Sequence, residues 1–308
     1  MRRSLLLWVA PVLFATTLVA KEQRVCITID DLPCAGCAEG TWRQVTTDLL
    51  ATLKKHRVPA IGFVNEGKLY HDGVFDSTRY ALLEQWLQAG MDLGNHTFGH
   101  QGTTDHTVAE YEVDVVKGER ALRPLMHRYG RTLRYFRHPF LQAGPTPGYR
   151  DSLNAVLARR GYVIAPVTFD NDEYIYAWCY EQAQRAADAA LMARRAASYQ
   201  LYMDSVMRFH EARTQAFLGR SIPQILLVHA NALNAAELDT LLTRLEQRGY
   251  VFVPLEEALQ DAVYTLPEAT TRYGFSWIRR WELAAGQQPP WPPEIDPDAQ
   301  RQYDARQR

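Results

Sequence analysis

The amino-acid sequence predicts an α/β protein built on a parallel sheet, either open or closed into a barrel. Short runs rich in Val, Ile, Leu and aromatic residues alternate about seven times with amphipathic helical stretches, which is typical of strand–helix units. Most of these runs lack polar alternation, as expected of strands covered on both faces. Glycines 90, 130, 161 and 249 directly follow helical stretches, where a left-handed cap is needed.

The expected elements follow one another along most of the chain. Strands are expected at residues 25–30, 59–65, 91–96, 133–137, 162–169, 224–229 and 250–253. Helices are expected at residues 42–56, 80–89, 108–128, 149–159 and 236–247. The first helix has a clear apolar face, because Val45, Leu49 and Leu53 recur at helical spacing. Together these elements predict a barrel-like unit over residues 25–262.

A long insertion interrupts the alternation at residues 175–221. No Gly or Pro occurs between Val167 and Leu218, and residues 181–217 are expected to form one long helix or a helical pair. An apolar stripe in this segment is expected to pack on the barrel, with a lid or an oligomer contact as the alternatives. The stripe comprises Tyr199, Tyr202, Met203, Val206, Met207 and Phe209.

Residues 263–308 form a tail rich in Trp and Pro. The tail contains Trp277, Trp281 and Trp291, the last of them inside a proline-rich run. Such composition favours an extended chain, so residues from 287 onward are expected to lie outside the core. The three tryptophans are expected to pack within the protein, with stacking on sugar rings as the alternative.

Composition and charge exclude several classes of protein. The 308 residues include 34 Lys and Arg against 35 Asp and Glu, for a formal net charge of -1, and 47% are hydrophobic. These values exclude a disordered chain and a collagen-like chain. The near-neutral charge also excludes a strongly basic nucleic-acid binder, so no nucleic acid is expected as a partner.

The first 20 residues are expected to be a signal peptide. Arg2 and Arg3 precede an apolar run over residues 4–19, and the small Ala20 is followed by the charged Lys21. An uncleaved membrane anchor is the alternative. Cleavage after Ala20 would leave 308 − 20 = 288 residues in the periplasm or outside the cell, with no transmembrane anchor.

Two of the four cysteines lie close together in the sequence. Because an exported protein can hold disulfides, Cys34 and Cys37 are expected to form a local bridge that stiffens a loop. Two unpaired thiols are the alternative. A zinc knuckle would need a second pair at similar spacing, which Cys26 and Cys179 do not provide.

Polar side chains gather where the expected strands end. The carboxyl ends of parallel strands meet at one edge of an α/β sheet, where reactive groups collect. Five expected strands end in such groups: Asp30 and Asp31; His96 and His100; Arg137 to Phe140; Asp170 to Tyr174; His229 to Asn231. Within the third group, His138 is expected to pack rather than to contact a substrate.

Asp31, His96 and His100 form a candidate metal triad. One carboxylate and two imidazoles suit zinc or another divalent transition metal, Co²⁺ and Ni²⁺ included, and leave a coordination position open. Two consecutive carboxylates are costly to bury without a cation nearby. Asp31 is therefore expected to bind the ion, and Asp30 to remain free as a base.

Four short motifs resemble those of a known family. In order and spacing, Thr28–Asp31, His96–His100, Arg137–Phe140 and Leu227–His229 are similar to successive motifs of the polysaccharide deacetylase family (NodB-homology domain, carbohydrate esterase family 4). The resemblance covers residues 25–259. It implies a distorted (β/α)7 barrel, and metal-dependent removal of acyl groups from N-acetylated sugars or, in some members, O-acetylated ones.

The resemblance also implies a role for each motif residue. Asp30 would act as general base beside Arg137, and Asp31, His96 and His100 would hold the metal. Next to Pro139, Phe140 stands where the family often has Tyr, and its backbone N–H would help hold the oxyanion.

The family's motif for the catalytic acid matches less well. His229 would protonate the leaving nitrogen, but the family's Asp-x-x-Asp-Trp motif corresponds poorly to residues 170–174. The acid that orients His229 stays open among Asp170, Asp172 and Glu173.

The sequence thus favours an exported, metal-dependent hydrolase that removes N-acyl groups from a carbohydrate. Two alternatives stay open. One is a hydrolase of a non-sugar linear amide on the same scaffold, and the other is a carbohydrate-binding envelope protein without turnover. The substrate, the native metal and the oligomeric state are not given by the sequence.

Overall fold

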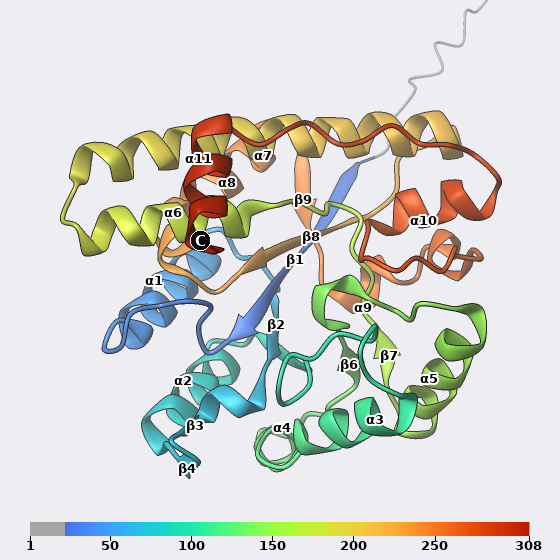
Figure 1. Ribbon diagram of the computed structural model, residues 1–308, viewed down its shortest axis with the longest axis horizontal. Coiled ribbons are helices and arrows are strands. Elements are labelled where there is room, and N and C mark those ends of the chain that lie inside the picture. The colour runs from blue at the N-terminus through green and yellow to red at the C-terminus, as the bar shows by residue number, and fades with distance from the viewer. Residues whose placement is uncertain (1–21, 308) are drawn as a thin grey trace, which may run out of the picture.

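The computed structural model describes residues 22–307, which fold around one curled parallel sheet (Figure 1). The signal peptide expected over residues 1–20 lies outside the described residues. Seven strands form the sheet: β1 (Gln23–Leu32), β2 (Ile61–Val64), β5 (Asp92–Asn95), β6 (Tyr135–Phe136), β7 (Val163–Ile164), β8 (Gln224–His229) and β9 (Tyr250–Phe252). Each strand expected from the sequence corresponds to one of them.

The order of the strands places β1 at the centre of the sheet. The order is β7-β6-β5-β2-β1-β8, and β9 pairs with the first residues of β1. Beyond β7, Phe169 bridges to Leu226 of the opposite edge strand β8, and the N–H groups of Thr168 and Phe169 both donate to the Ile225 carbonyl at 3.0 Å. The sheet therefore curls into a distorted barrel, which confirms the predicted fold class.

Helices pack around the sheet (Figure 1). They include α1 (Trp42–Lys55), α2 (Ser77–Gln88), α3 (Val108–Lys117), α4 (Leu122–Arg128), α5 (Pro147–Arg159), α8 (Ala232–Gln247) and α9 (Leu255–Ala258). Short 3₁₀ turns lie at Glu66–Leu69, Pro139–Leu141, Ala262–Thr265 and Ala305–Gln307. A small hairpin, β3 (Tyr70–His71) and β4 (Val74–Phe75), was not expected from the sequence.

The single helix expected over residues 108–128 is divided into α3 and α4. The buried carboxylate of Glu66 accepts hydrogen bonds from the N–H groups of Ala121 and Leu122 at 2.8 and 3.0 Å. The first N–H groups of a helix have no partner within it, so this carboxylate satisfies the start of α4. A tertiary contact thus sets a boundary that helical periodicity does not show.

The helical pair expected in the insertion is α6 (Glu173–Arg185) and α7 (Ala189–Leu218). The long helix α7 runs along one side of the molecule (Figure 1), against α6 and α8. Its stripe is buried as expected except at the half-buried Phe209, and Tyr199 and Met203 are fully inaccessible. Tyr199 also donates a hydrogen bond to the Asn234 side chain of α8 at 2.7 Å.

The tail is more deeply packed than its composition predicts. Helix α10 (Trp277–Ala284) buries Trp277 and Trp281, whereas Trp291 is 67% exposed. After the proline-rich run, Asp296 caps α11 (Pro297–Asp304), which crosses α6 (Figure 1). Ala299 of α11 is fully buried in the main core. Most residues from 287 onward are exposed or half-buried, as expected, but the expectation is wrong at Ala299, because the prolines lead into a second packed helix.

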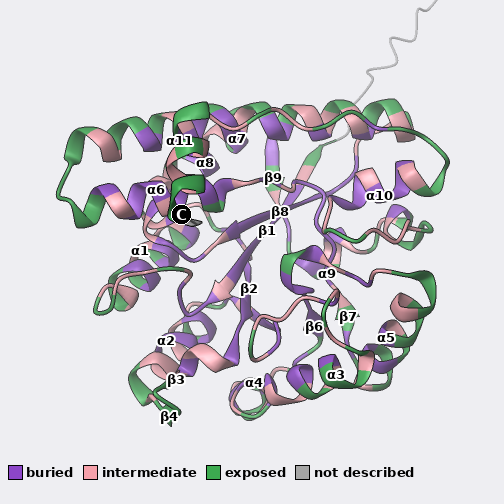
Figure 2. Ribbon diagram, viewed as in Figure 1, coloured by how far each residue is buried: buried purple, intermediate pink, exposed green. Residues whose placement is uncertain are grey.

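Burial concentrates on the central strands and on the inner faces of the surrounding helices (Figure 2). In β1, Ile27 and Ile29 on one face and Cys26 and Thr28 on the other are fully inaccessible, as a strand covered on both faces requires. Within residues 22–307, no helix is long and apolar enough to cross a bilayer.

Candidate active site

Two adjacent carboxylates stand at the end of β1. Consecutive side chains of a strand normally point to opposite faces, yet Asp30 and Asp31 line the same cavity. The register of β1 against β2 shifts between Ile29 and Leu32, and Asp31 has a left-handed φ of 69°. This local departure from strand geometry turns both carboxylates toward one site.

The turn that follows β5 presents two histidines to these carboxylates. Asn95 Oδ1 accepts a hydrogen bond from the Thr97 N–H at 2.7 Å, and both carboxylate oxygens of Asp114 accept from the Gly99 N–H at 3.1 and 3.0 Å. His100 has a left-handed φ of 53°. Side chains from β5 and α3 therefore hold an irregular backbone that brings histidines four residues apart to one place.

Asp31, His96 and His100 have the geometry and chemistry of a metal site. Asp31 Oδ1 lies 3.7 Å from His96 Nε2 and 3.5 Å from His100 Nε2, and one ligand atom from each residue lies within 4.8 Å of the others. The buried Asp31 Oδ1 has no hydrogen-bond partner among the described residues. His96 Nδ1 lies 2.8 Å from the Arg137 carbonyl, so it donates there and leaves Nε2 to accept, as in many metal-binding histidines.

The protonation of these groups also suits a divalent ion. Burial, helped by the neighbouring His100, holds the pKa of His96 well below its ordinary value. Burial likewise lowers the pKa of His100 despite the nearby Asp31. Burial opposes ionisation of Asp31, but the Lys68 ammonium outweighs burial and lowers the pKa of Asp31. Neutral imidazoles and an ionised carboxylate are the forms that bind metals.

Lys68 fixes Asp31 from the side of β2. Its ammonium donates to the Asp31 backbone carbonyl at 3.1 Å and lies 3.4 Å from Asp31 Oδ2. The oxygen that faces the histidines is Oδ1. Lys68 thus occupies one oxygen of the carboxylate and leaves the other to the triad.

Asp30 is held next to a buried arginine. Arg137 is fully inaccessible, its Nη1 lies 3.6 Å from Asp30 Oδ2, and its Nη2 donates to Thr28 Oγ1 at 2.9 Å. The guanidinium also lies over the Phe63 ring at 4.7 Å. Burial raises the pKa of Asp30 to about 6, against the lowering effect of Arg137. Asp30 is therefore a carboxylate at neutral pH whose proton affinity is close to that of a working general base.

His229 lies across the cavity at the end of β8, in register with Asp30. Its Nδ1 lies 3.3 Å from Glu173 Oε1, and the same oxygen accepts the His229 backbone N–H at 2.7 Å and the Asn234 amide at 2.6 Å. Glu173 is fully inaccessible. Burial would lower the pKa of His229, but Glu173 outweighs it and raises the pKa to about 9.

The other two acids considered as partners of His229 have different contacts. Asp170 accepts the Asn171 N–H at 3.0 Å, and burial together with Asp172 raises its pKa to about 7. The Tyr202 hydroxyl lies 3.5 Å from Asp172 Oδ2. Both acids line the cavity, but the acid in contact with His229 is Glu173.

The segment after β6 contributes a rigid turn. Phe140 and Leu141 have left-handed φ values of 54° and 53°, and the Phe140 ring is 57% exposed at the cavity, 4.4 Å from that of His100. The preceding Pro139 is buried. His138 packs its ring at 5.1 Å from that of Phe136, and burial lowers its pKa to about 3. It packs as expected, although it also lines the cavity.

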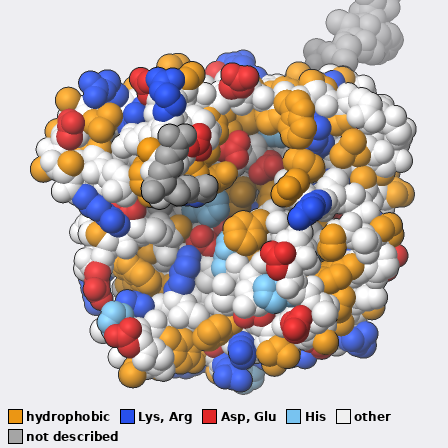
Figure 3. All heavy atoms as spheres, viewed as in Figure 1, with side chains coloured by type: hydrophobic (Ala, Val, Ile, Leu, Met, Phe, Trp, Pro, Cys, Tyr) orange, Lys and Arg blue, Asp and Glu red, His pale blue; other side chains and the backbone are white. Residues whose placement is uncertain are grey.

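These groups surround a single cavity of about 550 Å³. Figure 3 shows it as a hollow in this face of the molecule, with acidic and histidine side chains inside. Its wall comes from strand ends, from α6 and from the tail, including Trp178, Tyr303 and Arg306. The size falls in the range of roughly 300–1,000 Å³ typical of small-ligand pockets.

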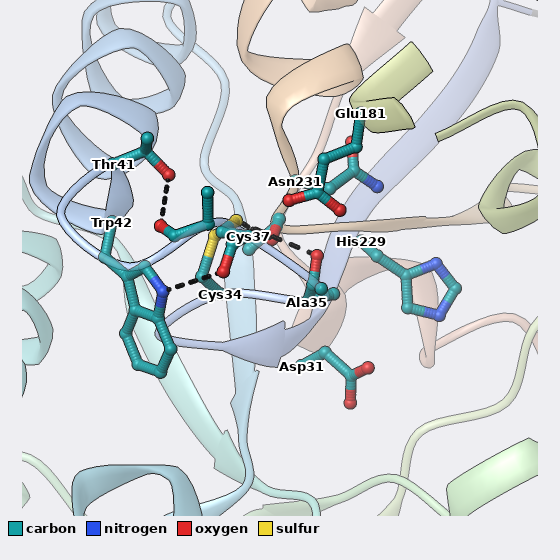
Figure 4. The surroundings of a disulfide bond; sticks show 12 residues. Asp31, Cys34, Ala35, Cys37, Thr41, Trp42, Glu181, His229 and Asn231 are labelled. Carbon is teal, nitrogen blue, oxygen red and sulfur yellow. Dashed lines mark hydrogen bonds between the residues drawn. A yellow bond between two sulfur atoms is a disulfide. The ribbon is translucent and has the colours of Figure 1, made fainter. Parts of the chain in front are cut away.

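A disulfide joins Cys34 to Cys37 in the loop after β1, as expected (Figure 4). The Ala35 N–H donates to the Ala230 carbonyl at 2.6 Å, next to His229. The indole of Trp42 donates to the Cys37 carbonyl at 3.3 Å. The bridged loop therefore connects the strand end with Asp31 to the strand end with His229, and Ala35 forms part of the cavity wall.

The residues predicted from the strand ends thus lie together, and several contributors were not predicted. Lys68 follows the end of β2 closely in sequence, and the polar Asn65 at that end was the signal that could have found it. Asn234 carries no such signal. Trp178 and Tyr303 come from helices 125 positions apart (303 − 178), so only the folded chain brings them together.

Comparison with known proteins identifies a family for this chain. Residues 18–165 match the family model of polysaccharide deacetylases. The chain carries a polysaccharide deacetylase domain. The matched segment includes the residues of the metal triad, Asp30 and Arg137. The family predicted from the four motifs is therefore confirmed.

A curated relative of the domain is the peptidoglycan-N-acetylglucosamine deacetylase PgdA of Listeria monocytogenes. It is 23% identical over 237 residues, which is 77% of this chain and 39% of the Listeria protein. The chain thus spans well under half the length of this relative.

Solved structures of the family are similar at lower identity. A polysaccharide deacetylase of Bacillus cereus is 19% identical, with a TM-score of 0.49 over 75% of this chain and 91% of that one. An acetyl xylan esterase of Clostridium thermocellum is 21% identical, with a TM-score of 0.49 over 77% and 91%. A family 4 pseudoenzyme of Bacillus anthracis is 18% identical, with a TM-score of 0.48 over 78% and 66%.

Proposed function

We propose that this protein is a metal-dependent hydrolase that removes N-acyl groups, in the first place N-acetyl groups, from a carbohydrate. The observation that carries the proposal is the meeting of three functions in one cavity. A metal triad (Asp31, His96, His100), a candidate base (Asp30) and a candidate acid (His229) all line it. Metal-assisted amide hydrolysis uses these three functions together.

The triad would hold the divalent ion, for which zinc is the first choice and Co²⁺ or Ni²⁺ the alternatives. When bound, such an ion polarises the acyl oxygen and lowers the pKa of water. Asp30 would accept the proton of the attacking water, for which it is suited by a pKa of about 6. Arg137 and Thr28 would keep the catalytic carboxylate in place through the buried guanidinium.

His229 would donate a proton to the departing nitrogen. An acid must be protonated before the bond breaks, and the raised pKa of about 9 keeps His229 charged at neutral pH. Glu173 would set both its charge and its orientation, since the Glu173 carboxylate contacts Nδ1 and leaves Nε2 for the substrate. The left-handed turn at Phe140 would offer its backbone N–H to the oxyanion, beside Pro139.

The comparisons support a substrate class and a location. The Listeria relative is named as a deacetylase of peptidoglycan N-acetylglucosamine, which supports an N-acetylated sugar of the cell envelope as the substrate. We therefore also propose export to the periplasm or the cell exterior. The proposed signal peptide over residues 1–20 and the Cys34–Cys37 disulfide are consistent with export.

The test combines metal analysis with acetate release from N-acetylated chito-oligosaccharides. The expected result is about one equivalent of zinc or a similar ion, and loss of both metal and acetate release in His96→Ala and Asp31→Ala. Metal retention in both variants would overturn the assignment of the triad. Metal binding without acetate release from any N-acetylated sugar would overturn the proposed reaction.

A further inference from the structure

A continuous series of aromatic rings runs from His229 to the tail. The Tyr174 ring centre lies 6.5 Å from that of His229 and 5.7 Å from that of Tyr303. Tyr303 in turn meets Trp178 edge-on at 5.7 Å. All four residues line the cavity. We refer to Tyr174, Trp178 and Tyr303 as the aromatic wall.

The part of this wall that comes from the tail is held firmly on the insertion. The Asp296 N–H donates to the Tyr176 hydroxyl at 2.9 Å, and Ser198 donates to the Asp296 carboxylate at 2.7 Å. Ala299 is fully buried and its carbonyl contacts Cys179 Sγ at 3.4 Å. These contacts fix α11 on α6 and α7, so Tyr303 has a defined position above the cavity.

Two strand-end loops at the cavity, the disulfide loop and the turn at Phe140, lie close to the insertion and the tail. A Cβ placed on Gly36, in the disulfide loop, would lie 3.4 Å from Glu181 Oε2 of α6, and Figure 4 shows Glu181 beside this loop. A Cβ placed on Gly274 of the tail would lie 1.7 Å from the Phe140 carbonyl oxygen, so only glycine allows that approach. Both contacts bring the strand-end loops against segments that lie outside the repeating barrel units.

The chemistry of the wall matches a sugar ring. The apolar face of a sugar packs on an aromatic ring, which offers a large rigid surface. Carboxylate oxygens accept hydrogen bonds from its hydroxyls, and the cavity presents Asp170, Asp172 and Glu181. A cavity of about 550 Å³ bordered by strand-end loops, α6 and the tail suits a ligand of small-molecule size rather than the middle of a long polymer.

We propose that the aromatic wall is a sugar-stacking subsite that makes the catalytic cavity selective for short or chain-terminal N-acyl saccharides. The inference rests on the proposed function and adds to it the length of the substrate and the residues that select it. Because the Tyr174 ring of the aromatic wall lies beside His229, a sugar stacked on the wall would lie next to the candidate acid.

The experiment compares acetate release from short N-acetylglucosamine oligomers with release from long soluble N-acetylated polymer, at equal concentrations of acetyl groups. Wild type is expected to be at least about tenfold more efficient on the short oligomers. Trp178→Ala and Tyr303→Ala are expected to raise KM for the oligomers about tenfold with kcat little changed, the mark of lost substrate binding. Trp178→Phe and Tyr303→Phe keep a ring and are expected to restore most of the affinity.

Trp291→Ala is the matched control. This tryptophan also belongs to the tail, but it is 67% exposed and packs beside Phe275 and Arg279 rather than at the catalytic cavity. Its KM is expected to equal that of wild type. Thermal unfolding of each variant identifies any that fails to fold, in which case the ring-preserving variants and the other alanine variant decide the outcome.

Equal efficiency on polymer and oligomers would overturn the inference while the proposed function stands. An unchanged KM in both alanine variants would overturn it too. If no substrate is hydrolysed, the proposed function fails, and calorimetric titration with the same oligomers then decides the subsite separately. Binding by wild type that both alanine variants lose supports the subsite, and absence of binding by wild type overturns it.

Discussion

The two sides of the candidate catalytic cavity are built differently. On one side, Asp30, His96 and Arg137 come from strand ends of the parallel sheet and are almost wholly buried, with positions fixed by backbone and side-chain hydrogen bonds. On the other side, the aromatic wall comes from α6 and α11. These rings are partly exposed, and Tyr174 is 42% exposed.

In the proposed function, this difference separates the residues that carry out the chemistry from those that select the substrate. Groups that move protons or hold a metal need fixed positions and a low local dielectric, which the sheet provides at its carboxyl edge. Groups that choose a substrate need accessible area, which the helical insertion and the tail provide. Glu173 belongs to both sides, because it is the first residue of α6 and the contact of His229. Changes on the strand-end side should therefore lower kcat or metal content, and changes on the helical side should alter KM.

Asp30→Asn should give the largest loss. The amide keeps the shape of the side chain but cannot accept the proton of the attacking water, and general bases contribute about 10²–10⁴-fold. We expect kcat for acetate release to fall by that factor while metal content, measured by atomic emission, stays at the wild-type level. Asp72→Asn, whose side chain is 93% exposed, is the control. A fall of only a few-fold in Asp30→Asn would exclude Asp30 as the base.

Glu173→Gln should move the alkaline limb of the pH profile. Glu173 raises the pKa of His229 to about 9 against burial, so removal of its charge leaves burial in control and the pKa falls. The acid form is present below the pKa and is lost above it. The alkaline loss of kcat should therefore begin about 1–3 pH units lower, whereas the acid limb, where Asp30 titrates with a pKa of about 6, moves little.

The control for this prediction is Asp172→Asn. Asp172 lines the same cavity but contacts Tyr202 instead of His229. The alkaline limb of the pH profile of Asp172→Asn should coincide with that of wild type. If both variants shift the limb equally, the effect is a general one of cavity charge, and Glu173 does not orient His229.

Ala299→Leu tests the helical side without altering any cavity residue. Ala299 is fully buried between α11 and α6, and extra methyl groups in a packed core cost about 1–3 kcal/mol. Displacement of α11 should move Tyr303 and raise KM several-fold, with kcat and metal content retained. Ala284→Leu, at an exposed position of α10, should leave KM unchanged. A lower metal content in Ala299→Leu would show that the two sides of the cavity are coupled.

Sequence predicts the strand-end side better than the helical side, for a physical reason. Asp30, His96, Arg137 and His229 stand at the ends of apolar runs, and parallel topology brings all such ends to one edge. The local sequence pattern therefore predicts that these side chains lie together in the folded protein. The irregular turns that complete the site, such as the left-handed Asp31, depend on contacts made only in the folded chain.

No comparable rule predicts from the sequence which residues come together on the helical side. The insertion and its buried stripe follow from composition and periodicity, but the place where α11 lies does not. Proline-rich sequence predicts an extended chain, yet a helix cap at Asp296 and one small residue, Ala299, are enough to dock a further helix. The partner of His229 could be narrowed to three acids, and only the fold brings Glu173 within 3.3 Å of it.

Removal of the disulfide should have the smallest effect, because the bridge joins residues only three apart in sequence. A loop this short contributes about 2 kcal/mol or less to the free energy of unfolding, and Ala35 stays hydrogen-bonded to Ala230 without it. The double variant Cys34→Ser, Cys37→Ser should unfold a few degrees lower and lose activity only a few-fold. Reductant should change the wild type in the same direction and leave the double variant unaffected, since Cys26 and Cys179 are buried and unbridged. Complete loss of metal in the double variant would instead show that the loop holds Asp31 in place, and would make the bridge part of the strand-end side.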